Sequence, residues 1–96
     1  MLKDALNRLG DRESDLRAVA LLRSALVERT STRYNDALRI HEGNRSLVGA
    51  SGNHALKGKF HNELGAVLML IGESERREDY KDRAFVEYAA ASFHFE

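Results

Sequence analysis

The 96 residues include 15 basic and 15 acidic side chains, so the formal net charge is zero. This balance disfavours a dedicated nucleic-acid binder, which usually has a basic excess because neutralising phosphates supplies most of its affinity. The chain has no cysteine, which excludes disulfides, thiolate zinc sites and cysteine nucleophiles. No segment has the ~18 consecutive apolar residues of a membrane helix or the apolar core of a signal peptide. We therefore expect one small soluble domain, residues 1–96, in the cytoplasm.

The first part of the chain has apolar residues at spacings of three and four, the pattern of one helix face. Residues 1–9 predict one or two helical turns, with Gly10 as a C-terminal cap. A second apolar stripe then predicts a longer helix over residues 12–29. The hydroxyl-rich residues 30–32 are expected to end this helix and to cap the one that follows.

The second long helix is predicted over residues 32–49. Gly43 and Gly49 weaken its second half, since an interior glycine costs roughly 1 kcal/mol relative to alanine. Residues 50–53 then form the clearest turn signal in the chain. The strongest helical pattern follows at residues 54–71, where one face is apolar in every turn. That face consists of Leu56, Phe60, Leu64, Val67, Leu68 and Ile71.

The last helix is predicted over residues 77–95. We expect Gly72 to end the third helix, and the charged run over residues 73–79 to form the connector and the first turn, with acids near the positive helix N-terminus. The stripe of this helix consists of Tyr80, Ala84, Tyr88, Ala91 and Phe95. Four helices with short joints predict antiparallel neighbours.

The third and fourth helices resemble the tetratricopeptide repeat, which is a helical hairpin. The matching residues are Leu64, Gly65, Leu68 and Gly72 in the third helix and Ala84, Tyr88 and Ala91 in the fourth. In that family, small residues at these positions let the two helices approach closely. The sequence departs from the family at His61, where an aromatic residue is usual. The joint between Gly72 and Ala84 is also about seven residues longer than the family's.

The first hairpin matches the family more loosely. Ala37 looks like the start of a second-helix signature, but His41 replaces the aromatic residue and Asn44 replaces the small one. The pair Leu21-Leu22 stands where the leucine–glycine pair would be. The resemblance therefore covers one hairpin well and the other in part.

From these patterns we predict an all-α fold, in which antiparallel helical hairpins stack as a fragment of a tetratricopeptide-like (TPR-like) α-solenoid. Residues 12–52 form the first hairpin and residues 53–96 the second, within one domain. The apolar run that reaches Phe93, Phe95 and Glu96 has no stop signal after it. This ending predicts that the chain is a piece of a longer repeat array.

The resemblance implies a non-catalytic scaffold that binds a protein partner. In that family the first helices of successive hairpins line a groove for a peptide or a partner helix. With Gly65 as the reference, the groove-facing residues would be Lys59, Asn62, Ala66 and Met69 in the third helix and Val19, Arg23 and Leu26 in the first hairpin. Lys59 and Asn62 would hold a peptide backbone or a carboxylate, although the full clamp of the carboxylate-binding members is missing.

The alternative function is a structural or self-associating segment. Solenoid repeats bury their apolar faces only by stacking, so two hairpins leave one end uncovered. The residues of that end would be Phe85, Ala89, Phe93 and Phe95. This alternative predicts that the chain forms a homo-oligomer.

The sequence predicts no catalytic, cofactor or metal site. His54 and His61 are seven residues apart, which is too wide for one zinc ion unless Glu63 or His94 comes near, and ordinary surface histidines are the expectation. The glycines at residues 52–59 miss the spacing of a phosphate-binding loop. A small enzyme or sensor domain would need a polar pocket with perturbed groups, which the pattern does not offer.

Overall fold

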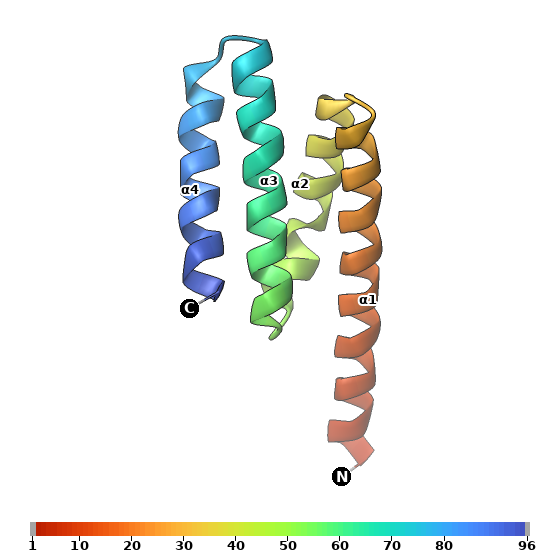
Figure 1. Cartoon of the computed structure of the whole chain (residues 1–96). Coiled ribbons are helices and arrows are strands. Elements are labelled where there is room, and N and C mark those ends of the chain that lie inside the picture. The colour runs from red at the N-terminus through yellow and green to blue at the C-terminus, as the bar shows by residue number, and fades with distance from the viewer. Residues whose placement is uncertain (1, 96) are drawn as a thin grey trace.

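The computed structural model describes the backbone of residues 2–95 and the side chains of residues 12–95. Four helices follow one another: α1 (Leu2–Thr30), α2 (Tyr34–Ala50), α3 (His54–Ser74) and α4 (Glu78–Phe95). Each runs antiparallel to the next, and α3 contacts α4, α2 and α1 (Figure 1). The described residues contain no strand. The prediction of an all-α fold with four antiparallel helices is therefore confirmed.

The start of the chain differs from the prediction. α1 continues without a break through Gly10, so the separate short helix over residues 1–9 and the cap at Gly10 are wrong. A glycine inside a helix loses only about 1 kcal/mol relative to alanine, and it keeps both backbone hydrogen-bonding groups. It ends a helix only where the chain turns into the left-handed conformation.

The two hairpin turns are made by residues other than glycine. Thr32 and Arg76 have positive φ angles of 64° and 53°. In the first turn Thr32 N donates to Arg29 O over 3.0 Å, which is part of the usual C-terminal cap geometry. In the second turn Arg77 N donates to Gly72 O over 2.8 Å. Gly72 therefore lies inside α3, and the prediction that it ends the helix is wrong by two residues.

Glycines set the distance between α3 and α4. Three of them recur every seven residues along α3 and face three larger side chains that recur every seven residues along α4. A Cβ atom added at any of these glycines would lie 2.7–2.8 Å from the facing side chain, closer than contacting carbons tolerate. The pairs are Gly58 with Phe95, Gly65 with Tyr88 and Gly72 with Lys81. The close approach predicted at Gly65 is confirmed, and it extends over the full hairpin.

Small residues of α4 complete this contact. Ala84 and Ala91 are 0% and 4% exposed, as predicted from their spacing around Tyr88.

The main core is formed where α3 buries its apolar face. This core takes side chains from all four helices, namely Ala18, Leu22, Val48, Leu56, Phe60, Leu64, Leu68 and Ala84.

In the first hairpin, alanines of α1 lie at the close contact with α2. Ala18 and Ala25 are fully buried in α1, whereas Leu21 is only half-buried. Asn44 Nδ2 donates to Ala18 O over 3.0 Å, so this carbonyl of α1 lies within reach of α2. The small alanine side chains at these positions give α2 the space to approach α1.

The molecule is thin, with extents of 54 × 27 × 16 Å. A thickness of 16 Å corresponds to two layers of helices, since packed helix axes lie about 8–10 Å apart. None of the described helices combines the length and the hydropathy that crossing a bilayer requires.

Candidate functional site

A groove of about 380 Å³ lies between α1 and α3. Its apolar lining comes mainly from two turns of α1 and from the first turn of α3, and its polar lining stands at the edges. The lining residues are Val19, Leu22, Arg23, Leu26, Asn53, Ala55, Leu56, Lys59 and Glu63. The groove thus joins residues of the first hairpin to residues of the second.

The structure brings together some of the residues predicted for a groove. Arg23 and Lys59, which are far apart in sequence, line the same groove, together with Val19 and Leu26. The other predicted members do not line it. Asn62 is exposed elsewhere on α3, Ala66 is half-buried, and Met69 packs against the main core.

Glu63 is a groove residue that the sequence analysis did not assign. It lies one turn after Lys59 and pairs with Arg29, whose Nε is 3.3 Å from Glu63 Oε2. The sequence could have indicated Glu63, because a residue four positions after Lys59 lies on the same face of the helix. The predicted stripe, which was transferred from the family pattern, used the spacing of three from Lys59 to Asn62 instead.

The rim of the groove is positively charged. Neither Arg23 nor Lys59 forms an ion pair with any side chain among residues 12–95. Glu63 is neutralised by Arg29, so it does not cancel their charge. The amide oxygen of Asn53 is used for capping α3, where it accepts a hydrogen bond from Leu56 N over 3.1 Å. The groove therefore combines an apolar floor with two cations that have no ion pair among the described side chains.

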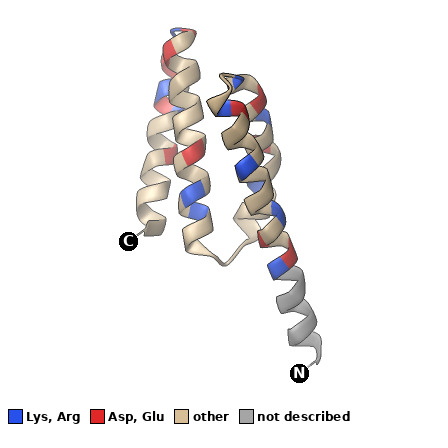
Figure 2. Ribbon diagram, turned by 45° about the vertical axis from the view of Figure 1, so that its right-hand side comes forward, with Lys and Arg blue, Asp and Glu red and all other residues tan. Residues whose placement is uncertain are grey.

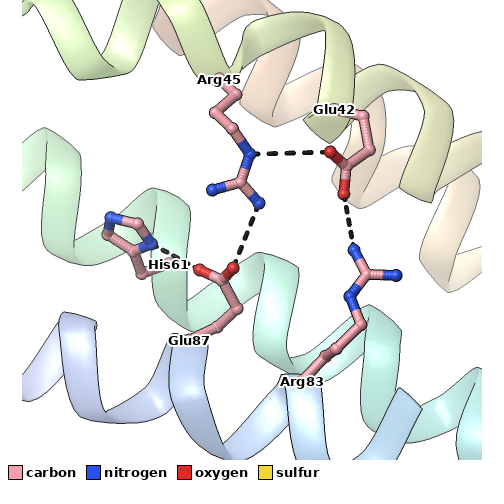
Figure 3. Close-up of polar contacts among 5 residues, drawn as sticks. All are labelled: Glu42, Arg45, His61, Arg83 and Glu87. Carbon is pink, nitrogen blue, oxygen red and sulfur yellow. Dashed lines mark hydrogen bonds and ion pairs between the residues drawn. The ribbon is translucent and has the colours of Figure 1, made fainter. Parts of the chain in front are cut away.

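A polar network connects the two hairpins away from the groove (Figure 3). Glu87 of α4 is only 8% exposed, and its carboxylate accepts from Arg45 Nη2 over 3.1 Å and lies 2.6 Å from His61 Nδ1. Glu42 of α2 pairs with Arg83 of α4 over 3.1 Å and with Arg45 over 3.6 Å. These side chains link α2 to α4 across α3, and nothing in the helical periodicity predicted them.

Three histidines gather at the end of the hairpin where α3 begins and α4 ends. His54 Nδ1 and His94 Nδ1 are 3.0 Å apart, and the rings of His61 and His94 stack with centroids 5.6 Å apart. Partial burial, together with the nearby His54, His61 and Lys57, lowers the pKa of His94. Among the described side chains, no group of three or more His, Cys, Asp or Glu is arranged to hold a metal ion.

The outer face of α4 is apolar and exposed. Phe85, Val86 and Phe93 are 62%, 68% and 70% exposed, and Ala89 lies exposed between them. From residue 88 to residue 95 the helix carries no Lys, Arg, Asp or Glu (Figure 2). Phe95 is also exposed, at 61%, but it lies against Gly58 and outside this stripe. Three of the four residues predicted for self-association therefore share one surface.

Comparisons with other proteins identify no family. No family model, curated protein or solved structure matches this chain.

Proposed function

We propose that this chain is a TPR-like helical repeat module, and that the groove between α1 and α3 binds an acidic, amphipathic segment of a partner protein. The single observation that carries the proposal is the groove itself. It spans both hairpins, has an apolar floor, and leaves Arg23 and Lys59 without an ion pair among the described residues.

The repeat character is supported by two sets of inward-facing positions with the same spacing. Ala84, Tyr88 and Ala91 of α4 have spacings of four and three, and they pack against α3. The same spacings recur in α2 at Ala37, His41 and Asn44, all of which are fully buried against their neighbours. Two hairpins built on one spacing are what a repeat array requires, because each repeat packs on the next through equivalent faces.

The positive charge of the rim favours a partner segment that carries carboxylates. An unpaired cation gains little from a neutral ligand and repels a basic one, whereas a carboxylate next to it steers association and fixes orientation. The floor offers Leu22, Leu26 and Leu56 to apolar side chains of the same segment. An acidic segment with leucine-like residues on one face satisfies both features, as in other helix-in-groove recognition.

The test uses a fluorescent synthetic helix that has leucines on one face and glutamates beside them. We expect saturable binding in an anisotropy titration, weakened at least about tenfold by Lys59→Glu or Arg23→Glu, since each replaces attraction by repulsion. Arg39→Glu is the matched control, because it makes the same charge change on an 80% exposed side chain outside the groove. The proposal fails if the peptide does not bind, or if Arg39→Glu weakens it as much as Lys59→Glu.

The exposed α4 stripe favours a second function, self-association with another copy through the same stripe. The outer face of α1 mixes Arg12, Glu13 and Arg17 with apolar residues, so a head-to-tail contact between α4 and α1 would bury charges. An α4-to-α4 contact centred on residues 85–93 buries mainly apolar surface and closes as a two-fold dimer. The exposed parts of Phe85, Val86 and Phe93 supply on the order of 400 Å² per copy, which suits a weak dimer.

This dimer is tested by sedimentation over a concentration series. We expect a monomer–dimer equilibrium, with the dissociation constant raised at least about tenfold by Phe93→Asp, since the stripe would then bury an unpaired carboxylate. Leu16→Asp is the matched control, because Leu16 is 64% exposed on α1 and outside the stripe. A clean monomer at high concentration, or equal effects of the two variants, would exclude this dimer.

A further inference from the structure

Three histidines lie where α3 begins and α4 ends, outside the groove and the α4 stripe. His54 Nδ1 and His94 Nδ1 point at each other over 3.0 Å, with ring centroids 5.2 Å apart, which is the geometry of a hydrogen bond. A neutral imidazole has one nitrogen that donates and one that accepts, so the bond forms when only one of these two Nδ1 atoms carries a hydrogen. This bond joins the first turn of α3 to the last turn of α4.

Two added protons remove this hydrogen bond. Both nitrogens of a protonated imidazole ring are donors. The pair accepts a first proton, because a charged ring still donates to a neutral one, but a second proton would turn two charged N–H groups toward each other. Like charges at this distance disfavour the protonated form of each ring.

The surroundings of His94 add positive charge instead of compensating it. α3 is the helix packed against α4, and its side chains near His94 are His54, Lys57 and His61. The His61 ring is stacked on the His94 ring, with 2° between the planes and centroids 5.6 Å apart. Within residues 12–95, Glu87 is the one carboxylate that pairs with any of these histidines, and it is shared between His61 and Arg45. Among these residues, none supplies His94 itself with a carboxylate.

The contact with α3 disfavours protonation of His94. Partial burial, followed by the nearby His54, His61 and Lys57, lowers the pKa of His94. A group whose pKa is lower in the docked than in the released state takes up its proton on release, so acid favours the released state. The contribution of His94 to the contact is complete above its ordinary pKa of 6.5 and is lost as the pH falls below that value.

Few contacts hold the last turn of α4. Ser92 and Phe93 are exposed, whereas His94 and Phe95 contact α3. The Phe95 ring lies over Gly58, since a Cβ atom on that glycine would be 2.7 Å from the ring's Cζ. Two side chains therefore decide whether residues 92–95 stay on α3.

We propose that these histidines form a pH-sensitive latch. At neutral pH the hydrogen bond between His54 and His94 holds residues 92–95 against α3, and protonation of both rings releases this turn and uncovers Gly58. Histidine clusters respond between about pH 5 and pH 7, because imidazole changes its charge there. The docked pair holds one proton fewer than the released pair, so the ratio of docked to released turns falls by roughly 30-fold between pH 7.5 and pH 5.

The experiment follows the α-protons of Gly58 by NMR in the full chain between pH 7.5 and pH 5. The ring current of Phe95 displaces these signals while the turn is docked, and we expect at least half of this displacement to be lost at pH 5. Gly65 is the internal control, because the Tyr88 ring lies over it in the middle of the same hairpin, and its signals should not move.

Unchanged Gly58 signals would mean that the charged rings turn into solvent while residues 92–95 stay in place, and would overturn the proposal. Equal movement of the Gly65 signals would mean that the whole hairpin loosens, and would overturn it as well. The unmodified chain alone decides this, so the result does not depend on how a variant folds.

Glutamine in place of either histidine tests whether the pair is the cause. The glutamine of His94→Gln can bond to His54 whether or not that ring is protonated, because an amide both donates and accepts. We expect the Gly58 signals of His94→Gln and of His54→Gln to stay constant over this pH range, and Phe95→Leu gives the position of the signals without a ring. If both glutamine variants respond to acid as the unmodified chain does, the histidine pair is not the latch.

Discussion

His41 is fully buried in α2, and neither of its ring nitrogens has a hydrogen-bond partner among the described residues. The oxygen of Asn44, one turn later, likewise has no partner in this part of the chain. His41 occupies the position in α2 that Tyr88 occupies in α4, and its ring lies edge-on to Phe60 with centroids 5.8 Å apart. Here the histidine fills an aromatic position as a neutral ring.

This burial makes stability depend on pH. Desolvation, opposed in part by Glu42 and reinforced by Arg29, lowers the pKa of His41 from 6.5 to about 4. The unfolded chain therefore binds more protons at this residue between these two pH values. The stabilising contribution is complete above pH 6.5 and is lost as the pH falls towards 4. At pH 4.5 the loss should be roughly 2–3 kcal/mol.

Urea unfolding at pH 7.5 and pH 4.5 measures this loss, and the variant His41→Phe isolates it from the carboxylates that titrate in the same range. We expect the free energy of unfolding to fall less with pH in His41→Phe than in the unmodified chain. Equal pH dependence in the two proteins would mean that His41 does not titrate in the folded state as its burial implies.

At the scale of helix pairs, the contact between α3 and α4 depends on glycine as a small residue. Gly65→Ala would place a Cβ atom 2.8 Å from the Tyr88 ring, so we expect a loss of about 1–3 kcal/mol from overpacking. Gly43→Ala is the matched control in α2, where a Cβ atom would meet nothing within 4 Å. It should stabilise the protein by about 0.5–1 kcal/mol.

Thermal or urea unfolding of the two variants checks these opposite signs. A stabilising Gly65→Ala would show that the Tyr88 ring moves away without cost. The close packing of this hairpin would then not depend on the glycines.

The same helices show which features the sequence could predict. The close approach at Gly65, Ala84 and Ala91 was predicted from the resemblance to the tetratricopeptide repeat, whose small residues these positions match. The roles of Gly10 and Gly72 were not, because a glycine that ends a helix and one that admits a neighbour look alike in sequence. Only the left-handed angles at Thr32 and Arg76 identify the true turns.

The candidate site was predicted only in part for a related reason. Periodicity places Lys59 and Arg23 on exposed faces of their own helices, but the crossing of α1 over α3 decides which neighbours share the groove with them. Glu63 lines it and Asn62 does not. The approach of His94 to His54 depends likewise on the register of α4 against α3, which no local pattern specifies.

At the scale of the whole molecule, one core connects both hairpins. Phe60 and Leu64 of α3 belong to the same cluster as Ala18 of α1, Val48 of α2 and Ala84 of α4. The ion pair between Arg45 and Glu87 adds a second link between α2 and α4. Such sharing predicts that neither hairpin unfolds without exposing the core of the other, so the chain behaves as one domain.

Tyrosine fluorescence can test this cooperativity, because Tyr34 lies in the first hairpin, whereas Tyr80 and Tyr88 lie in the second. With Tyr34→Phe, fluorescence reports only the second hairpin, while circular dichroism reports all four helices. We expect the two urea transitions to coincide, with the same midpoint and the same slope, since the shared core is lost in one step. A second hairpin that persisted to higher urea than the total helix signal would instead mean two independent units, and a groove between α1 and α3 would then not be held as a rigid site.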